Sequence, residues 1–329
     1  MCRSCHRARG GLSLVRTTDG GGARLPARRA SRRRLGASAR CAARSGPGVP
    51  ARSAPIADAL IVRALLGAFV AGGVAITGRR AGSLSLRGHW AAFALGTLVV
   101  TAGWAWGALL IAYFVATSLL TRLGGARKEA RTESMLPVQR ERNALQVGAN
   151  GGVFAALILL GEVTGDARLS VAGVGALAAA AADTWATEIG TLWGGAPRSI
   201  LSGRVVPAGT SGGITAIGST ASVLAAALVA LAAHLILGLE QQGAASPAFA
   251  VFLGGIGGSL GDSVLGATLQ SKRWCEQCRM WTERKVHTCQ YRTRHAAGLR
   301  WMTNDTVNLL ATVLGAVLAF LTTVPFAPR

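Results

Sequence analysis

Residues 180–190 have the sequence Ala-Ala-Ala-Asp-Thr-Trp-Ala-Thr-Glu-Ile-Gly. They close an apolar run that begins at Leu169 and predicts a membrane-spanning helix. Asp183 and Glu188 are therefore expected at or just below the bilayer surface. A charge at that depth is costly unless a partner or water meets it, so a pair of acids there indicates a functional site.

The composition excludes an ordinary soluble domain. Of 329 residues, 50% are hydrophobic, the mean hydropathy is +0.39, and the apolar residues gather in long runs without charge. These features predict an all-α, polytopic transmembrane bundle, whose many Gly and Ala residues let helices approach closely. The net charge of +21 is divided between the N-terminus and a few loops, so we expect no nucleic-acid partner.

The first 55 residues differ from the rest of the chain. They are rich in Arg, Ser and Ala and contain a single acid, Asp19. This composition is typical of a transit peptide for a plastid or mitochondrion. A disordered basic tail that stays on the protein is the alternative. The transmembrane domain is then expected over residues 56–324.

About eight spans are predicted. The apolar runs are residues 56–78, 90–120, 151–163, 169–192, 213–239, 248–269 and 305–324. The run at 90–120 is too long for one upright helix. Dividing it in two near Gly103 and Gly107 places the basic loops (79–87, 122–142, 198–204 and 272–300) on one side, as the positive-inside rule requires. The run at 151–163 is short, so it is either re-entrant or extended by the polar helix before it.

Polar donors precede the run at 151–163. Arg142, Gln146 and Asn150 have i, i+4, i+8 spacing, which puts them in one row on a helix that could grip phosphate. Lys128 in the preceding loop could add a charge. An amphipathic surface helix is the alternative interpretation.

Acids also occur in later apolar runs, at Asp262 and Asp305. We expect Asp183 and Asp262 to hold Mg²⁺, since this ion usually takes one or two carboxylates plus substrate phosphates. Glu188 and Asp305 would complete the site or hold a second metal. For Asp183 and Glu188 the alternative is a pair of buried acids satisfied by Arg or Trp donors.

Amides accompany two of these acids. Gln270 lies two helical turns beyond Asp262, and Asn308 lies three residues beyond Asp305, so each pair shares a face. Both amides are candidate ligand-binding groups. Asn304 could instead cap the last helix, with Asp305 favouring the helix dipole.

A glycine-rich loop precedes the run at 213–239. Its candidate phosphate-binding residues are Gly209, Thr210, Ser211, Gly212 and Gly213. It is not a Walker A loop, because no Gly-Lys-Ser/Thr follows. A plain loop with Thr210 or Ser211 as helix cap is the alternative.

A basic loop over residues 271–303 contains Cys275, Cys278, His287 and Cys289. This spacing suits a Cys₃His zinc site, which would be structural because four protein ligands leave no open position. A redox pair at Cys275 and Cys278, or unligated thiols, are the alternatives.

Five motifs, taken in order, resemble the membrane family that includes plant phytyl-phosphate kinase. They are Arg-Asn-Ala-x-Gln-Val-x-Ala-Asn-Gly-Gly from Arg142, the stretch at 180–190, Gly-Thr-Ser-Gly-Gly-Ile-Thr from Gly209, Gly-Ser-Leu-Gly-Asp-Ser-Val-Leu-Gly-Ala-Thr-Leu-Gln from Gly258, and Asn-Asp-x-Val-Asn from Asn304. The resemblance spans residues 56–324. It implies transfer of a phosphoryl group from a nucleoside triphosphate to phytyl phosphate, giving phytyl diphosphate for tocopherol (vitamin E) synthesis.

The plastid-like N-terminus then places the protein, as a multi-pass protein, in a chloroplast membrane, either envelope or thylakoid. The resemblance assigns no catalytic residues; the four acids are inferred from position and charge. Arg142, Lys128 and the amides of residues 209–213 would hold phosphates. An ion- or proton-coupled transporter and a nucleotidyltransferase acting on a lipid phosphate are the competing functions.

Overall fold

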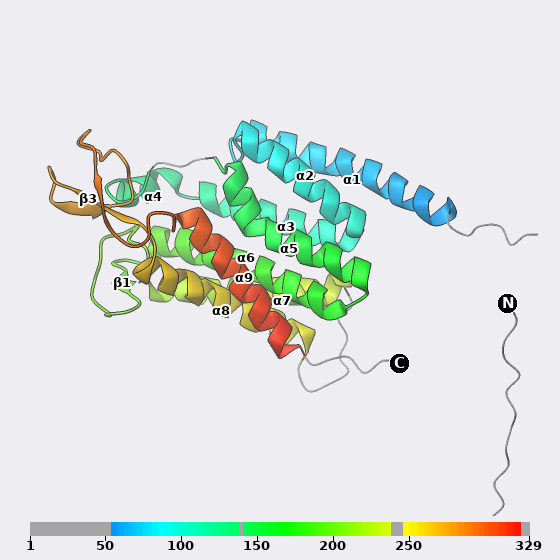
Figure 1. Cartoon of the computed structure of the whole chain (residues 1–329). Coiled ribbons are helices and arrows are strands. Elements are labelled where there is room, and N and C mark those ends of the chain that lie inside the picture. The colour runs from blue at the N-terminus through cyan, green and yellow to red at the C-terminus, as the bar shows by residue number, and fades with distance from the viewer. Residues whose placement is uncertain (1–53, 138–140, 238–245, 324–329) are drawn as a thin grey trace, which may run out of the picture. The chain divides into compact units, whose positions relative to one another are not determined.

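The computed structural model describes residues 54–137, 141–237 and 246–323, which form a helical bundle with a small β-structure at one end (Figure 1). The predicted transit segment lies almost wholly outside the described residues. The long helices are α1 (Ala54–Arg80), α2 (Leu86–Ala102), α3 (Trp104–Arg122), α5 (Ala144–Thr164), α6 (Ala167–Trp193), α7 (Ala216–Leu237), α8 (Pro247–Thr268) and α9 (Asn304–Thr322).

Seven of these helices are long and apolar enough to cross a membrane. The eighth, α2, has 17 residues and is about 26 Å long, which is near the lower limit for a span. Large apolar side chains are exposed on the bundle, for example Phe69 of α1, which is 81% exposed. The predicted all-α polytopic bundle is confirmed.

Two uncertain spans are settled by the helix boundaries. The run at 90–120 is divided at Gly103, where α2 ends and α3 begins. The short run at 151–163 is part of α5, which starts earlier, at Ala144, and has 21 residues. The second run is therefore a full-length helix rather than a re-entrant segment.

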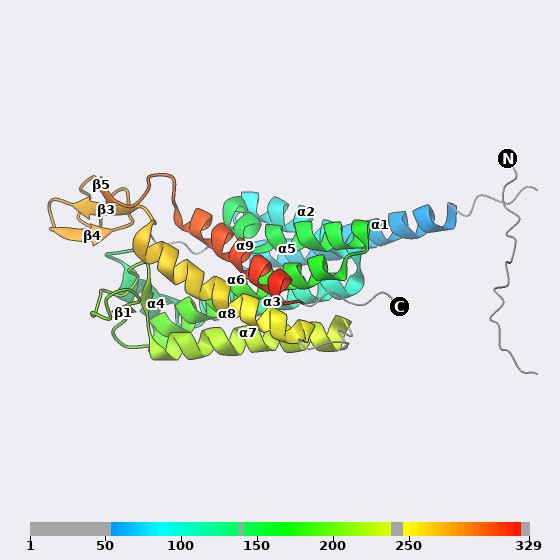
Figure 2. The same cartoon turned by 60° about the horizontal axis from the view of Figure 1, so that its bottom comes forward.

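Short elements gather at the end of the bundle where the basic connections lie. They are α4 (Gly125–Thr132), the two-stranded sheet of β1 (Arg198–Ser199) and β2 (Gly213–Ile214), and residues 271–303, which we call the cap (Figures 1 and 2). The opposite end has the short α2–α3 and α5–α6 connections. The α7–α8 connection, residues 238–245, lies outside the described part of the chain.

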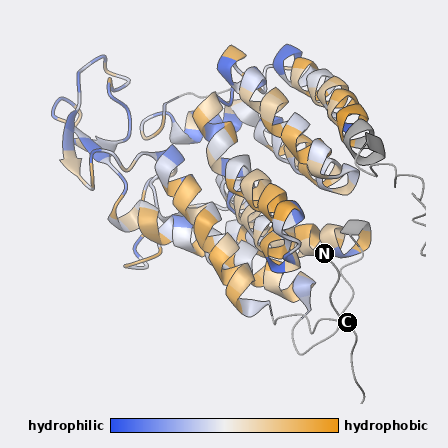
Figure 3. Cartoon of the chain, turned by 45° about the vertical axis from the view of Figure 1, so that its right-hand side comes forward, coloured by the Kyte–Doolittle hydropathy of each residue, from blue (hydrophilic) through white to orange (hydrophobic). Residues whose placement is uncertain are grey.

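The cap is more ordered than the loop that the sequence suggested. Its strands β3 (Lys272–Cys275), β4 (Met280–Thr282) and β5 (Arg294–Ala297) form an antiparallel sheet in the order β4-β3-β5. Trp274 and Trp281 face each other across the β3–β4 pair, with ring centroids 5.2 Å apart. Figure 3 shows that the cap is largely hydrophilic, in contrast to the helices.

Small residues let α6, α8 and α9 touch at the centre of the bundle. A methyl group added to Gly254 of α8 would lie 2.5 Å from the carbonyl oxygen of Gly315 and 3.3 Å from Gly175 Cα. One added to Gly258 would lie 2.4 Å from Ala179 Cβ. These contacts leave no space for a side chain, so the three helices pack backbone to backbone.

Candidate functional site

The central packing brings Asp183 and Asp262 together. Gly175 and Ala179 of α6 meet Gly254 and Gly258 of α8, so the two helices run parallel and stay in register every four residues. One further turn along each helix places Asp183 beside Asp262, near enough for their charges to repel.

Both acids lie inside their helices rather than at the ends. Asp183 is ten residues before Trp193, the last residue of α6, which is about 15 Å along the helix axis. Asp262 is six residues before the end of α8, or about 9 Å. Asp183 is thus deeper in its helix than the apolar run suggested. Within the described residues, Asp262 Oδ2 is buried without a hydrogen-bond partner.

A third acid, Glu283, joins this pair from the cap and also repels Asp262. Ser211 of the glycine-rich loop donates a hydrogen bond to its carboxylate, and Gln270 is a second hydrogen-bond partner. Burial raises the pKa of Glu283, whereas burial lowers the pKa of nearby Lys272. We call Asp183, Asp262 and Glu283 the acidic site.

Glu283 is not among the site residues predicted from the sequence. It lies in a basic, polar segment, where a single acid resembles an ordinary surface charge. The signal that could have found it is its place four residues before His287 in a segment with metal-ligand spacing. Such a segment is expected to fold compactly and to direct its intervening side chains.

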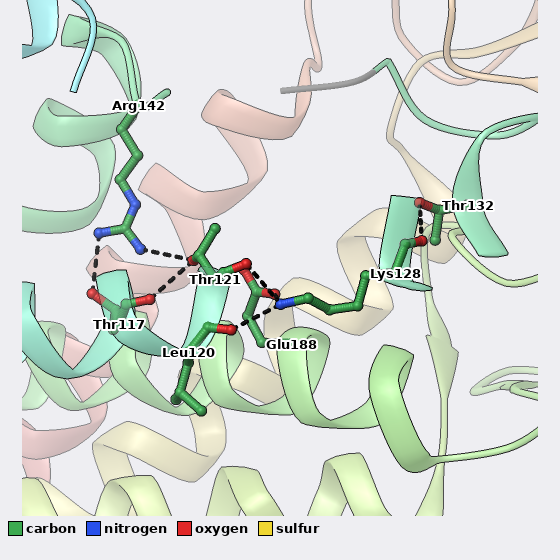
Figure 4. A network of polar contacts seen from close by, with 7 residues as sticks. All are labelled: Thr117, Leu120, Thr121, Lys128, Thr132, Arg142 and Glu188. Carbon is green, nitrogen blue, oxygen red and sulfur yellow. Dashed lines mark hydrogen bonds and ion pairs between the residues drawn. The ribbon is translucent and has the colours of Figure 1, made fainter. Parts of the chain in front are cut away.

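Glu188 points to a different partner. Its carboxylate accepts a hydrogen bond from Lys128 Nζ at 2.5 Å, and the same ammonium group donates to the carbonyl oxygens of Leu120 (2.8 Å) and Thr121 (2.9 Å) (Figure 4). Lys128 is buried, and all three of its hydrogens have acceptors. In this arrangement the Lys128 ammonium is fully engaged within the chain, and Glu188 is its ion-pair partner.

Arg142 lies before α5 rather than on it, so the expected helical row is only partly present. Asn143 caps the helix, and the Gln146 side chain accepts a hydrogen bond from the Asn143 amide at 3.0 Å. The Arg142 guanidinium donates to Thr117 Oγ1 at 3.0 Å and to Thr121 Oγ1 at 3.4 Å (Figure 4).

Arg142, Gln146 and Asn150 nevertheless line one cavity between α1, α2, α3 and α5. The rest of its wall is mostly apolar, with side chains such as Leu95 and Phe114. The cavity therefore has an apolar body and one wall that carries a cation and two amides, which suits an amphiphilic ligand.

Tyr113 connects this cavity with the acidic site. Its side chain lines the cavity, and its buried hydroxyl lies close to Thr184 and within electrostatic range of both Arg142 and Asp183. No group in the described chain meets hydrogen-bond geometry with this hydroxyl. A ligand in the cavity could thus place a polar head between Arg142 and Asp183.

The glycine-rich loop has less free backbone than expected. The Thr210 amide donates to the Pro207 carbonyl, and the Gly213 amide donates to the Thr210 carbonyl, so these two are used within the loop. The residue that caps α7 is Thr215, whose Oγ1 accepts a hydrogen bond from the Gly218 amide, so the alternative with Thr210 or Ser211 as the cap is wrong.

Gly212 presses this loop against the end of α8. Its φ is +78°, and a methyl group there would lie 2.7 Å from the carbonyl oxygen of Ser263. Gly209, at φ +85°, has a similar left-handed conformation beside Met135. This packing presents Ser211 to Glu283.

Asp305 and Asn308 lie on the first two turns of α9. The helix cap is Thr303, whose side chain accepts from the Thr306 amide, so the suggested Asn304 cap is wrong. Four residues beyond Asn308, Thr312 donates to the Ala149 carbonyl at 3.0 Å, next to Asn150. Asn308 therefore lies about one turn from the cavity wall, whereas no described contact joins Asp305 to the acidic site.

Residues 69–316 match the family model described as Integral membrane protein DUF92. The chain belongs to this family. It is 35% identical to Protein PGR of Arabidopsis thaliana over 217 residues, which cover 59% of this chain and 74% of that one. It is also 29% identical to an uncharacterized membrane protein, MJ0933, of Methanocaldococcus jannaschii, over 65% of this chain and 74% of the relative.

A third relative is named Protein VTE6, chloroplastic, of Arabidopsis thaliana. It is 27% identical over 243 residues, which cover 72% of this chain and 65% of the relative. No solved structure gives a significant match. The family thus shows a multi-pass membrane protein in contact with the lipid bilayer.

Two sites in this DUF92 protein have donor sets that suit metals. The acidic site offers carboxylate oxygens, including the unpartnered Asp262 Oδ2, which are the ligands that Mg²⁺ prefers. In the cap, one ligand atom from each of Cys275, Cys278, His287 and Cys289 lies within 4.8 Å of the other three. There the His287 side chain lowers the pKa of Cys289 to about 6, and the Cys289 sulfur raises the pKa of Cys278 to about 11.

Proposed function

We propose that this protein is a membrane lipid kinase that transfers a phosphoryl group from a nucleoside triphosphate to phytyl phosphate, giving phytyl diphosphate for tocopherol synthesis. The resemblance of its five motifs to the family of plant phytyl-phosphate kinase supports this reaction. A chloroplast membrane is the proposed location, supported by the plant relatives PGR and VTE6.

The observation that carries the proposal is the connection made by Tyr113. The cavity, of about 70 Å³, has space for the head-group end of an isoprenoid phosphate, and Arg142 on its wall can hold the phosphate. Tyr113 lines the same cavity and lies within electrostatic range of Asp183, which supports a phosphate position near the acids. A lipid phosphate would then lie between a cation and carboxylates, as phosphoryl transfer requires.

The acidic site is the proposed position for the nucleotide phosphates. Asp183, Asp262 and Glu283 would hold Mg²⁺, which when bound neutralises phosphate charge and aligns the reacting groups. Ser211 and Gln270 fix the Glu283 carboxylate. No general base is needed, because a phosphate monoester is already anionic near neutral pH.

Two competing functions make different products. A nucleotidyltransferase would use the same acids but release pyrophosphate. A coupled transporter would move a substrate without changing it, and the depth of Asp183 inside α6 is the observation that favours this class.

One assay separates the three. Membranes containing the protein are given phytyl phosphate and each labelled nucleoside triphosphate in turn, and lipid and nucleotide products are separated. We expect phytyl diphosphate and a nucleoside diphosphate. A nucleotidyl lipid with pyrophosphate would support the transferase, and unchanged phytyl phosphate would contradict both enzymes.

The matched variants are Asp262→Asn and Asp166→Asn. Both remove one negative charge, but Asp166 caps the opposite end of α6 and accepts hydrogen bonds from Arg168. Asp262→Asn should lower the rate at least about 100-fold, as expected for loss of a group that acts through charge neutralisation. Asp166→Asn should keep nearly full activity. Full activity of Asp262→Asn would remove this residue from the mechanism.

A further inference from the structure

The cap contains a second cluster of ligand-type side chains, separate from the acidic site. Cys275 ends β3, Cys278 lies in the β3–β4 turn, and His287 and Cys289 lie between β4 and β5. One ligand atom from each residue lies within 4.8 Å of all the others. Cys275 and His287 are buried, and Cys278 and Cys289 are exposed.

The distances suit a metal rather than a disulfide. Cys275 Sγ and Cys289 Sγ are 3.6 Å apart, and His287 Nδ1 is 3.4 Å from Cys289 Sγ. A disulfide would bring two sulfurs to about 2.05 Å. Tetrahedral zinc with Zn–S bonds of about 2.3 Å separates two sulfurs by about 3.8 Å, close to the spacing seen here.

The backbone also turns around the sulfurs. Arg279 (φ 51°) and Gln290 (φ 64°) are the non-glycine residues of the described chain with left-handed φ, and each directly follows a cysteine of the cluster. The Tyr291 amide donates to Cys289 Sγ. Two tight turns that close on cysteines, with an amide directed at sulfur, are the local structure that a bound metal stabilises.

The same segment carries Glu283 to the acidic site. The Thr282 hydroxyl and the Glu283 amide both donate to the Met135 carbonyl, at 3.1 and 2.8 Å. Thr282 ends β4, and His287 follows five residues later, so Glu283 lies between a strand and two cluster residues. Any group that holds the cluster together therefore also restricts where Glu283 points.

We propose that Cys275, Cys278, His287 and Cys289 bind one Zn²⁺, and that this ion holds the cap in the conformation that places Glu283 beside Asp262. The zinc is structural, since four protein ligands leave no position for substrate. The ligand set stands without the kinase proposal, whereas the positioning role rests on the same acidic site.

Metal content tests the ligand set. The full-length protein is purified in detergent, and zinc is measured by plasma mass spectrometry together with protein concentration. We expect about one zinc per chain. Cys278→Ser and Cys289→Ser should lose most of it, whereas Cys41→Ser, the same change outside the cluster, should keep it. A metal-free protein, or a disulfide among these cysteines in the intact mass, would overturn the site.

Tryptic cleavage tests the positioning role without any activity assay. Arg284 and Lys285 directly follow Glu283, and we expect removal of zinc by a chelator to increase cleavage there at least about tenfold, reversed when zinc is restored. This comparison uses wild-type protein and so does not depend on whether the Cys variants insert. Zinc binding with unchanged cleavage would disprove the positioning role. Zinc binding without kinase activity would disprove only the proposed function.

Discussion

Lys128 is a buried cation whose three hydrogens are all in use, two on the carbonyl oxygens that end α3 and one on Glu188. Removing one member of such a pair leaves the other charge without compensation. The structure therefore gives Lys128 a stabilising role, whereas the sequence indicated a phosphate-binding one.

We expect Lys128→Met to lower the free energy of unfolding. For a fully buried pair the loss is about 3–5 kcal/mol, and it is smaller here because the Glu188 side chain is 19% exposed. Thermal unfolding of the purified protein measures it. The double variant Lys128→Met/Glu188→Leu should recover much of the loss. A stable single variant that binds nucleotide poorly would instead restore the phosphate-binding role.

When it is ionised, Glu283 should lower the free energy of unfolding. Its pKa lies above the ordinary 4.5 because burial disfavours the charge, so the folded state binds a proton that the unfolded chain has already released. The contribution of this group to stability is fully present below pH 4.5 and is lost as pH rises through the raised pKa.

Glu283→Gln is thus expected to melt at a higher temperature than wild type at about pH 8, with a difference that shrinks as the pH falls towards 4.5. The control is Glu276→Gln in the same cap, where the hydrogen bond from Arg294 lowers the pKa of an exposed carboxyl. That variant should melt slightly lower than wild type. A lower melting temperature for Glu283→Gln than for wild type would show that hydrogen bonds and nearby charges offset the cost of burying the Glu283 carboxylate.

At the residue scale, the sequence identified the acids whose surroundings are apolar. A carboxylate among Ala and Gly is costly, so Asp183 and Asp262 could be recognised without a structure. Tyr113 could not, because it becomes part of the site only through distant contacts. The one sequence signal for Glu283 is its place four residues before His287 in the segment with metal-ligand spacing. Asn143 is of a residue type that often caps helices. It could therefore have predicted that Arg142, one residue earlier, lies outside α5.

At the scale of elements, the contact between α6 and α8 sets the spacing of Asp183 and Asp262. A methyl group on Gly258 would meet Ala179 Cβ at 2.4 Å and the Ala311 carbonyl at 2.8 Å. Both neighbours belong to packed helices and cannot move aside cheaply. Separation of the helices at this point would separate the acids one turn away.

Gly258→Ala should therefore destabilise the protein by about 1–3 kcal/mol and reduce activity. Gly152→Ala in α5 is the matched control, since a methyl group there meets nothing within 4 Å. Both variants replace Gly by Ala within a helix and so gain the same helix propensity. The difference between their melting temperatures therefore measures the effect of the close contact at Gly258. Equal melting temperatures for the two variants would mean that α6 and α8 can adjust without cost.

The helices were more predictable than the strands for a physical reason. An apolar run about 20 residues long is a strong signal, and the charges at its ends indicate where a longer run is divided, as at Gly103. The strands of the cap have three or four residues, too few for an alternating pattern to emerge. Their pairing depends on contacts between turns that the sequence does not specify.

At the scale of the whole molecule, the fold predicts which loops share a side of the membrane. The α5–α6 connection and the α6–α7 connection lie at opposite ends of α6. Thr164, which ends α5 beside the first connection, and Ser202 in the second connection are both exposed. Their environments should therefore be accessible from opposite faces of a sealed vesicle.

We expect an impermeant maleimide added outside sealed vesicles to label only one of the variants Thr164→Cys and Ser202→Cys. Peptide mass spectrometry distinguishes these positions from the native cysteines. Detergent should make both positions reactive, which controls for local accessibility. Labelling of both positions in intact vesicles would contradict the assigned crossing of α6.

The cavity wall and the acidic site are built from different helices. Apolar wall residues such as Leu95 and Phe114 come from α2 and α3, whereas Asp183 and Asp262 come from α6 and α8. Under the proposed function, changes in the volume of wall side chains would alter which lipid is accepted without displacing a carboxylate. If the proposed kinase function holds, divergence within the family would change the preferred lipid by substitutions in two helices, while the reaction chemistry would stay the same.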